Sequence, residues 1–225
     1  MRLGRPVRIG GALGLIALAL LVVAGSAAAT RSAVVVTKTG WGEEKTGADA
    51  SLYSFGAKVV NRSRRDAIGV TVTVKTLRPG GVQDDEDFQI VAIPAGQSFV
   101  VADEHGNLGK ARLTRVTGKV HVRSLRPHDK TDRLPGVSRI RLDRKNNAVS
   151  AVITNRYLFP FSLQKATAYA VLYNSTGRII GGGTAFSLWL GRGPKSLKPG
   201  GHTQVAIDVS GKMSQVAHVQ VSATP

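Results

Sequence analysis

Basic residues gather between positions 123 and 145, where their side chains could bind an anionic partner. The cluster consists of Arg123, Arg126, Lys130, Arg133, Arg139, Arg141, Arg144 and Lys145. Guanidinium and ammonium groups bind phosphate and carboxylate groups through charge and hydrogen bonds. The formal net charge of the chain is +17. We therefore predict contact with an anionic polymer or a membrane surface; a solvated surface without a ligand is the alternative.

Residue patterns typical of catalysis, cofactor binding or metal binding are missing. The sequence has no Gly-x-Ser-x-Gly elbow and no cysteine, and its histidines are scattered at positions 105, 121, 128, 202 and 218. The acidic run 84–87 lacks calcium-loop spacing and favours a solvated turn. We predict no enzyme, no cofactor and no catalytic or metal-binding residues. The alternative is an enzyme whose active site is assembled between the two modules that are described below.

The first 29 residues have the pattern of a secretory signal peptide. Arg2, Arg5 and Arg8 precede an apolar stretch at 12–24, and small residues at 27–29 fit a cleavage site. The uncharged segment 9–30 is also just long enough to span a bilayer, so an uncleaved anchor is the alternative. Removal of the signal leaves 28 basic residues (31 minus 3) against 14 acidic ones, a net charge of +14.

The predicted export limits where the chain acts and which partners it can meet. We predict a secreted or cell-surface protein, and the absence of cysteine favours a bacterial source. Nucleic acid is not expected as a partner, because export separates the chain from it and no recognition helix or RNA-binding aromatic set is visible. A protein partner stays open.

The apolar pattern after residue 30 is that of β-strands. Val70, Val72 and Val74 alternate with polar residues, and the period of two indicates a strand buried on one side. The same pattern predicts that Ile140 and Leu142 are buried between exposed arginines. The glycine-rich stretch 40–50 is predicted to be a loop. The expected class is all-β.

Two parts of the sequence resemble each other. The matching segments are 57–62 with 151–156, 70–77 with 167–173, 93–96 with 197–200, and 120–122 with 219–221. We predict two tandem immunoglobulin-like β-sandwich modules, at 30–125 and 137–225, joined by a charged, proline-bounded linker at 126–136. Chance convergence of strand and turn signals is the alternative. Asn61 and Asn155, each after an apolar run, are predicted to satisfy strand-end amides.

The second module resembles the FxLYD-type β-sandwich domain of exported bacterial proteins. The resemblance lies in Ala151-Val-Ile-Thr-Asn155, Leu172-Tyr173-Asn174 with the turn to Gly177, and Leu197-Lys-Pro-Gly200. Asn174 replaces the family's Asp, and Ala170 stands where the family has Phe. The first module is similar to exported actinobacterial proteins of the same sort.

The resemblance implies a binding or structural module without catalytic residues. We therefore predict a non-catalytic module of the bacterial cell envelope that contacts anionic polymers through its basic surface. A membrane-anchored accessory domain of a larger assembly is the alternative.

Overall fold

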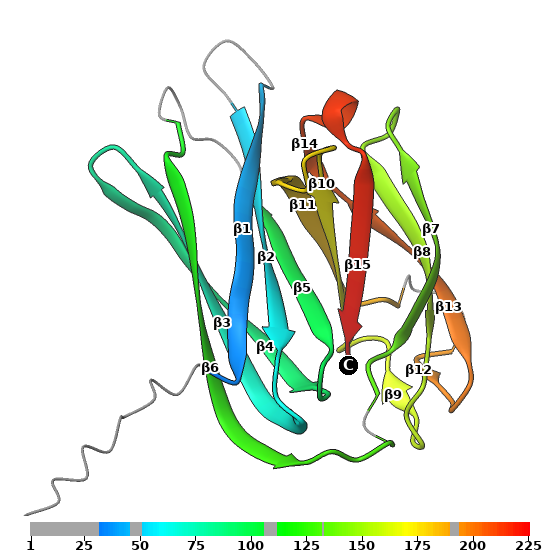
Figure 1. Cartoon of the computed structure of the whole chain (residues 1–225). Helices are drawn as coiled ribbons and strands as arrows, with labels where there is room; N and C mark the ends of the chain where they lie inside the picture. The colour runs from blue at the N-terminus through cyan, green and yellow to red at the C-terminus, as the bar shows by residue number, and fades with distance from the viewer. Residues whose placement is uncertain (1–31, 46–50, 106–111, 132, 190–193) are drawn as a thin grey trace, which may run out of the picture. The chain divides into compact units, whose positions relative to one another are not determined.

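The computed structural model describes residues 32–45, 51–105, 112–131, 133–189 and 194–225 (Figure 1). The predicted signal peptide, residues 1–29, lies outside these ranges. The described chain consists of antiparallel β-strands and a 3-10 helix, η1 (Met213–Gln215). The predicted all-β class is confirmed. Within the described ranges, no helix is long and apolar enough to cross a membrane.

The first half of the described chain forms two facing sheets. Its strands are β1 (Val34–Lys45), β2 (Ser51–Asn61), β3 (Arg65–Arg78), β4 (Gly81–Ile93), β5 (Ser98–His105) and β6 (Arg115–Pro127). Sheet I has the order β4-β3-β6, and sheet II has the order β1-β2-β5. Between them lies a core that includes Phe55, Val72 and Phe99, all fully buried. The predicted alternation of β3 is confirmed, because Val70, Val72 and Val74 all face this core.

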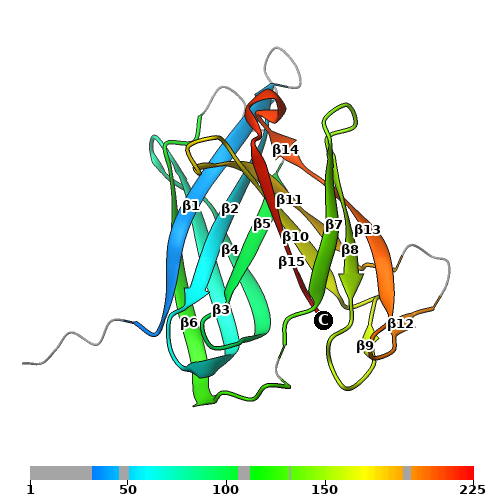
Figure 2. The ribbon, with the colours of Figure 1, turned by 45° about the vertical axis from the view of Figure 1, so that its right-hand side comes forward.

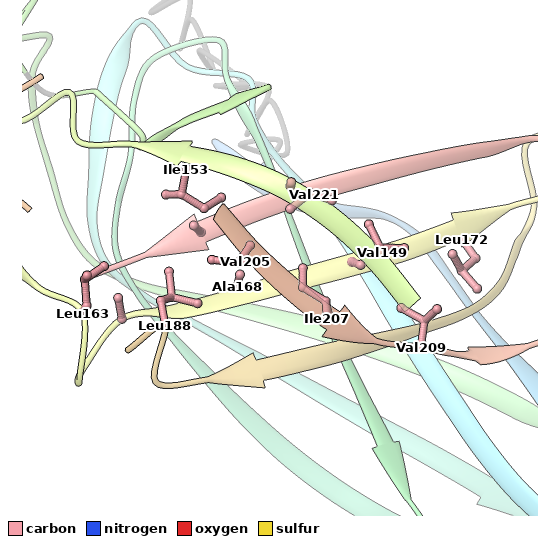
Figure 3. Packing of buried hydrophobic residues seen from close by; sticks show 14 of the residues in the cluster. Val149, Ile153, Leu163, Ala168, Leu172, Leu188, Val205, Ile207, Val209 and Val221 are labelled. Atoms are coloured by element: carbon pink, nitrogen blue, oxygen red, sulfur yellow. The ribbon is translucent and has the colours of Figure 1, made fainter. Parts of the chain in front are cut away.

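The second half forms two further facing sheets. Its strands are β7 (Gly136–Asp143), β8 (Ala148–Thr154), β9 (Phe161–Ser162), β10 (Thr167–Tyr173), β11 (Ile179–Phe186), β12 (Ser196–Leu197), β13 (His202–Asp208), β14 (Ser210–Gly211) and β15 (His218–Thr224). Sheet III has the order β14-β11-β10-β15, sheet IV has the order β13-β8-β7, and β9 pairs with β12. Figure 3 shows Val149, Ile153 and Ile207 of sheet IV packing with Leu172 and Val221 of sheet III.

The two halves share their strand order. In sheets II and IV, the first two strands of each half pair with each other, and the second of them also pairs with a later strand. The resulting orders are β1-β2-β5 and β7-β8-β13. In sheets I and III the corresponding orders are β4-β3-β6 and β11-β10-β15. Sheet III therefore corresponds to sheet I, and sheet IV corresponds to sheet II.

Asn61 and Asn155 make the same hydrogen bonds in the two halves. Asn61 Nδ2 donates to the carbonyls of Arg65 and Ile93, both at 2.8 Å, and its Oδ1 accepts from a backbone N–H two residues on. Asn155 Nδ2 donates to the carbonyls of Phe159 (2.9 Å) and Leu197 (2.8 Å), and its Oδ1 accepts from the corresponding N–H. The predicted strand-end role of both residues is confirmed.

Sheets II and III pack face to face, so that residues 32–225 form one compact unit. In Figures 1 and 2 these sheets are neighbours in both views. Glycines allow the close approach: a Cβ at Gly42 would overlap the carbonyl oxygen of Ile180 and lie 2.8 Å from the Cα of Gly211. Ser54 Oγ donates to the carbonyl of Ser210 (2.6 Å) and accepts from a backbone N–H of β11.

Three local predictions were wrong. In the predicted loop at 40–50, residues 40–45 belong to β1, because the glycines there allow sheet packing, and residues 46–50 lie outside the described ranges. Ile140 is 38% exposed, because a register shift in β7 beside Arg139, which has a φ of 51°, breaks the alternation. The acidic run lies within β4, where Asp85 pairs with Lys75 across sheet I.

Candidate anion-binding groove

The segment between β6 and β7 crosses from the first half to the second, and we call it the crossing segment. An open groove lies beside it, and we call this groove the linker groove. Its cavity volume is about 560 Å³. Its walls are the crossing segment, the start of β5, the end of β15 and the loop after β8. The lining residues are Gln97, Ser98, Phe99, His128, Lys130, Arg133, Leu134, Pro135, Val137, Arg156, Gln220, Val221, Ser222 and Ala223. Groups from both halves therefore face one space.

Three basic side chains converge on this groove. Lys130 and Arg133 come from the crossing segment, and Arg156 comes from the loop between β8 and β9. Arg133 Nε donates to the carbonyl of Lys130 at 3.0 Å, which orients the guanidinium on its own segment. Within the part of the chain that the structure describes, no carboxylate lies within ion-pair distance of these three groups. The groove is therefore suited to phosphate or carboxylate groups.

Gly136 positions Arg156 at the groove. A Cβ at Gly136 would lie 2.6 Å from Arg156 Nε and 3.1 Å from its Cζ. The guanidinium thus rests directly on the backbone at the start of β7. A side chain at position 136 would displace the cation without removing its charge.

Asp66 fixes the start of the crossing segment. Its carboxylate is fully buried and accepts hydrogen bonds from Asp129 N (2.8 Å), Ala95 N (2.8 Å) and His128 Nδ1 (2.7 Å). Burial alone would raise the pKa of Asp66, but these hydrogen bonds outweigh it and hold the pKa below its ordinary value. The contact joins β3 of the first half to the groove wall, because His128 also lines the groove.

Replacing Asp66 by asparagine is expected to lower the free energy of unfolding by about 2 kcal/mol at neutral pH. A carboxylate with a lowered folded pKa stabilises the fold above its unfolded pKa, and this contribution is lost as the pH falls through the folded value. The difference between wild type and Asp66→Asn should therefore shrink as the pH falls below 3.8, the ordinary carboxyl pKa. Urea unfolding at several pH values measures it. A difference independent of pH would contradict the role of the ionised carboxylate.

The structure separates the sequence-predicted cations. Lys130 and Arg133 share the groove, whereas Arg123 lies on sheet I with its side chain over Gly69. Arg126 lies at the end of β6. Hydrogen bonds from Thr131 lower the pKa of Asp129, and the charge of Arg126 lowers it further.

The remaining predicted cations belong to the second half. Arg139 and Arg141 are exposed on β7, and Lys145 is exposed in the turn that follows. Arg144 binds the loop around η1, where it donates hydrogen bonds to the carbonyls of Met213 (3.4 Å) and Val216 (2.9 Å). These residues do not line the groove.

Arg156 was not among the predicted contact residues. It lies 23 positions after Arg133 (156 minus 133) and outside the basic cluster. The available signal was its neighbour Asn155: a predicted strand-end asparagine places the next side chain at the end of the sandwich. The approach of that end to the crossing segment follows from the packing of sheets II and III.

A larger groove, of about 690 Å³, runs along β1 beside the turn at 174–178. Three basic residues line it: Lys38, Arg178 and Lys212. Lys38 donates to the carbonyl of Gly177 (2.9 Å) and lies over the Tyr173 ring, 5.8 Å from the centroid. Glu43 also lines this groove. Because a carboxylate lies among its basic residues and Lys38 is already bonded, it suits an anion less well than the linker groove does.

Carboxylates with raised pKa values lie at the other end of β5. Burial raises the pKa of Asp103, and burial together with the charges of Asp208, Glu44 and Asp103 raises the pKa of Glu104. Neither of the two larger grooves is lined by Asp103 or Glu104. Among the described residues, no group of three or more His, Asp or Glu is placed to hold a metal ion.

Comparison with known proteins leaves the family open. No protein-family model matches the chain, and no curated protein matches it. Among solved structures, it is similar to the crystal structure of red sea bream transglutaminase, with 12% identity and a TM-score of 0.22. The match covers 84% of this chain, which spans 31% of the transglutaminase chain. At this identity and TM-score the likeness assigns no activity, and the FxLYD-type resemblance stays a prediction.

Proposed function

We propose that the chain is an exported, non-catalytic module of the cell envelope that binds an anionic polymer through the linker groove. The observation that carries the proposal is the convergence of Lys130, Arg133 and Arg156 without a described carboxylate partner. Polymers that carry repeated phosphate or carboxylate groups would bind several of these cations at once. The net charge, +17 for the full sequence and +14 without the predicted signal peptide, favours their approach.

The proposal includes an origin by duplication of one immunoglobulin-like sandwich. The common strand order of the two halves supports this origin. The bonds of Asn61 and Asn155 support it further, because their acceptors Ile93 and Leu197 stand at the start of matching sequence segments. Duplication accounts for a groove at the junction, since joining two modules brings the end of one beside the end of the other.

Replacing the three groove cations by glutamine (Lys130→Gln, Arg133→Gln, Arg156→Gln) is expected to weaken polymer binding at least about tenfold. The binding of wild type should also weaken as the salt concentration rises. Retention of the exported chain on purified cell-wall polymer, measured at low and high salt, tests both expectations.

The matched control removes the same charge from the opposite end of sheet I (Arg78→Gln, Arg112→Gln, Arg115→Gln). Arg115 pairs with Leu77 at the end of β3, whereas the linker leaves β6 beside Arg65. Equal losses in the two triple variants would show that net charge alone, and not the groove, determines binding. Salt-independent retention would contradict an electrostatic contact.

A further inference from the structure

The loop at 155–160 exposes two large apolar side chains beside the groove. Leu158 is 76% exposed and Phe159 is 59% exposed. The loop is fixed at both ends by Asn155, which accepts a bond from Tyr157 N (2.8 Å) and donates to the carbonyl of Phe159 (2.9 Å). The backbone that presents Leu158 and Phe159 is therefore held by hydrogen bonds to the buried side chain of Asn155.

Aromatic contacts connect the loop to the core. Phe161 is 4% exposed, and its ring meets the Tyr157 ring edge-on at 6.0 Å. Tyr157 in turn stacks on Phe159, with centroids 5.3 Å apart. Burial raises the pKa of Tyr157 to about 12, so its hydroxyl stays neutral. Phe159 thus extends outward from a row of rings that begins in the core.

The first half supplies an internal comparison. Its corresponding loop makes the same asparagine bonds, but its residues after Asn61 are Arg62, Ser63, Arg64 and Arg65. This backbone conformation therefore forms with charged and polar side chains. The fold does not require leucine and phenylalanine at positions 158 and 159, so their exposure points to an external partner.

Charge indicates the chemistry of that partner. Arg156 belongs to this loop and lines the groove together with Lys130 and Arg133. Exposed aromatic and aliphatic side chains flanked by cations match the interface of a bilayer with anionic headgroups, which takes up apolar groups beneath a layer of phosphates.

The start of the described chain lies at the same end. Arg62 N donates to the carbonyl of Ala33, and Asn61 N donates to the carbonyl of Gln97, a lining residue of the groove. The apolar segment 12–24 precedes this point in the sequence. An uncleaved anchor, the alternative raised from the sequence, would bring this end of the fold to the bilayer.

We propose that the loop at 155–160 inserts Leu158 and Phe159 into the interfacial layer of an anionic membrane, while Arg156, Lys130 and Arg133 contact lipid phosphates. This contact goes beyond polymer binding and shares with it only the groove cations. The chain would then lie at the boundary between membrane and wall.

The test uses a probe at position 158. Because the chain has no cysteine, Leu158→Cys provides a single thiol for an environment-sensitive fluorophore. Val82→Cys is the control, since Val82 is 54% exposed on sheet I. With phosphatidylglycerol-containing vesicles, the probe at position 158 should shift to the blue and be quenched by brominated lipid tails. The probe at position 82 should do neither. The local readout is independent of any insertion by the N-terminal segment.

A second measurement uses the exported chain without a label. Leu158→Ser with Phe159→Ser should lower partitioning into phosphatidylglycerol vesicles at least about tenfold and leave retention on cell-wall polymer unchanged. The exposed control pair, Val82→Ser with Val91→Ser, should partition like wild type. Both pairs should fold, since all four side chains are more than half exposed.

The outcomes separate the two proposals. A probe at position 158 that is neither shifted nor quenched overturns membrane insertion, whatever the polymer retention. Unchanged polymer retention of the groove triple variant overturns the proposed function while leaving the loop result intact. A probe that shifts without lipid, together with a dimer in sedimentation that Leu158→Ser dissociates, overturns lipid insertion in favour of a second copy of the chain.

Discussion

Replacing Gly42 by alanine is expected to lower the free energy of unfolding by about 3 kcal/mol, a large share of the stability of an ordinary domain. The new Cβ would overlap the carbonyl oxygen of Ile180 and press on the Cα of Gly211. Both are backbone atoms, so no side-chain rotation can relieve the overlap. Sheets II and III would have to move apart, which would loosen the contact among Val100, Val171 and Ile179. Chemical denaturation measures the loss.

The control for this substitution is Gly96→Ala. Gly96 has a φ of 71° and nothing within 4 Å of a Cβ, so alanine there strains the backbone without a collision. Its expected cost is about 1 kcal/mol. Equal losses for the two variants would show that sheets II and III do not depend on close approach at Gly42.

Replacing Asn155 by alanine is expected to lower the free energy of unfolding by about 3 kcal/mol. The side chain is 1% exposed and bonds three backbone groups. Alanine would leave the carbonyls of Phe159 and Leu197 and the N–H of Tyr157 without this partner. The first half offers the same test in Asn61→Ala, and a similar loss is expected because its bonds are the same.

Asn174→Ala is the control for the asparagine variants. Asn174 Oδ1 also accepts three bonds, from Thr176 N, Thr176 Oγ1 and Arg178 N, but in an exposed turn. Water can replace these partners, so the expected loss is about 1 kcal/mol or less. A loss at Asn174 equal to that at Asn155 would contradict the importance of burial. Thermal unfolding followed by circular dichroism provides the comparison.

Short residue patterns were sufficient to predict the strands and their ends. The period of two at Val70, Val72 and Val74 reports a buried face without reference to the rest of the chain. Asn61 and Asn155 indicate strand ends, because an asparagine side chain can form hydrogen bonds with nearby backbone groups. A turn forms between Tyr173 and Gly177, with Asn174 Oδ1 accepting from the N–H groups of Thr176 and Arg178 and Gly177 at a φ of 72°.

The junction of the halves could not be predicted in the same way. It depends on Gly40, Gly42 and the glycines of β11, and a residue without a side chain leaves no hydrophobic pattern. The glycines at 40 and 42 therefore predict a loop at 40–50, whereas residues 40–45 belong to β1. Prediction of the groove was incomplete for the same reason: charge identified Lys130 and Arg133, but Arg156 joins them only through the packing of two distant sheets.

The order of the sheets has a consequence for self-assembly. Sheets I, II, III and IV are stacked in this order, and the second half repeats the first in the same direction. In such a head-to-tail arrangement, a further sheet could in principle be added to the stack. The outer face of sheet IV corresponds to the face of sheet II that packs on sheet III through its glycines. There the paired residues Gly40 and Gly56 are replaced by Arg141 and Ser150, paired at the same distance before Asn155. Arg141 carries a long side chain where sheet II has a glycine, so another sheet could not approach sheet IV there as closely as sheet III approaches sheet II.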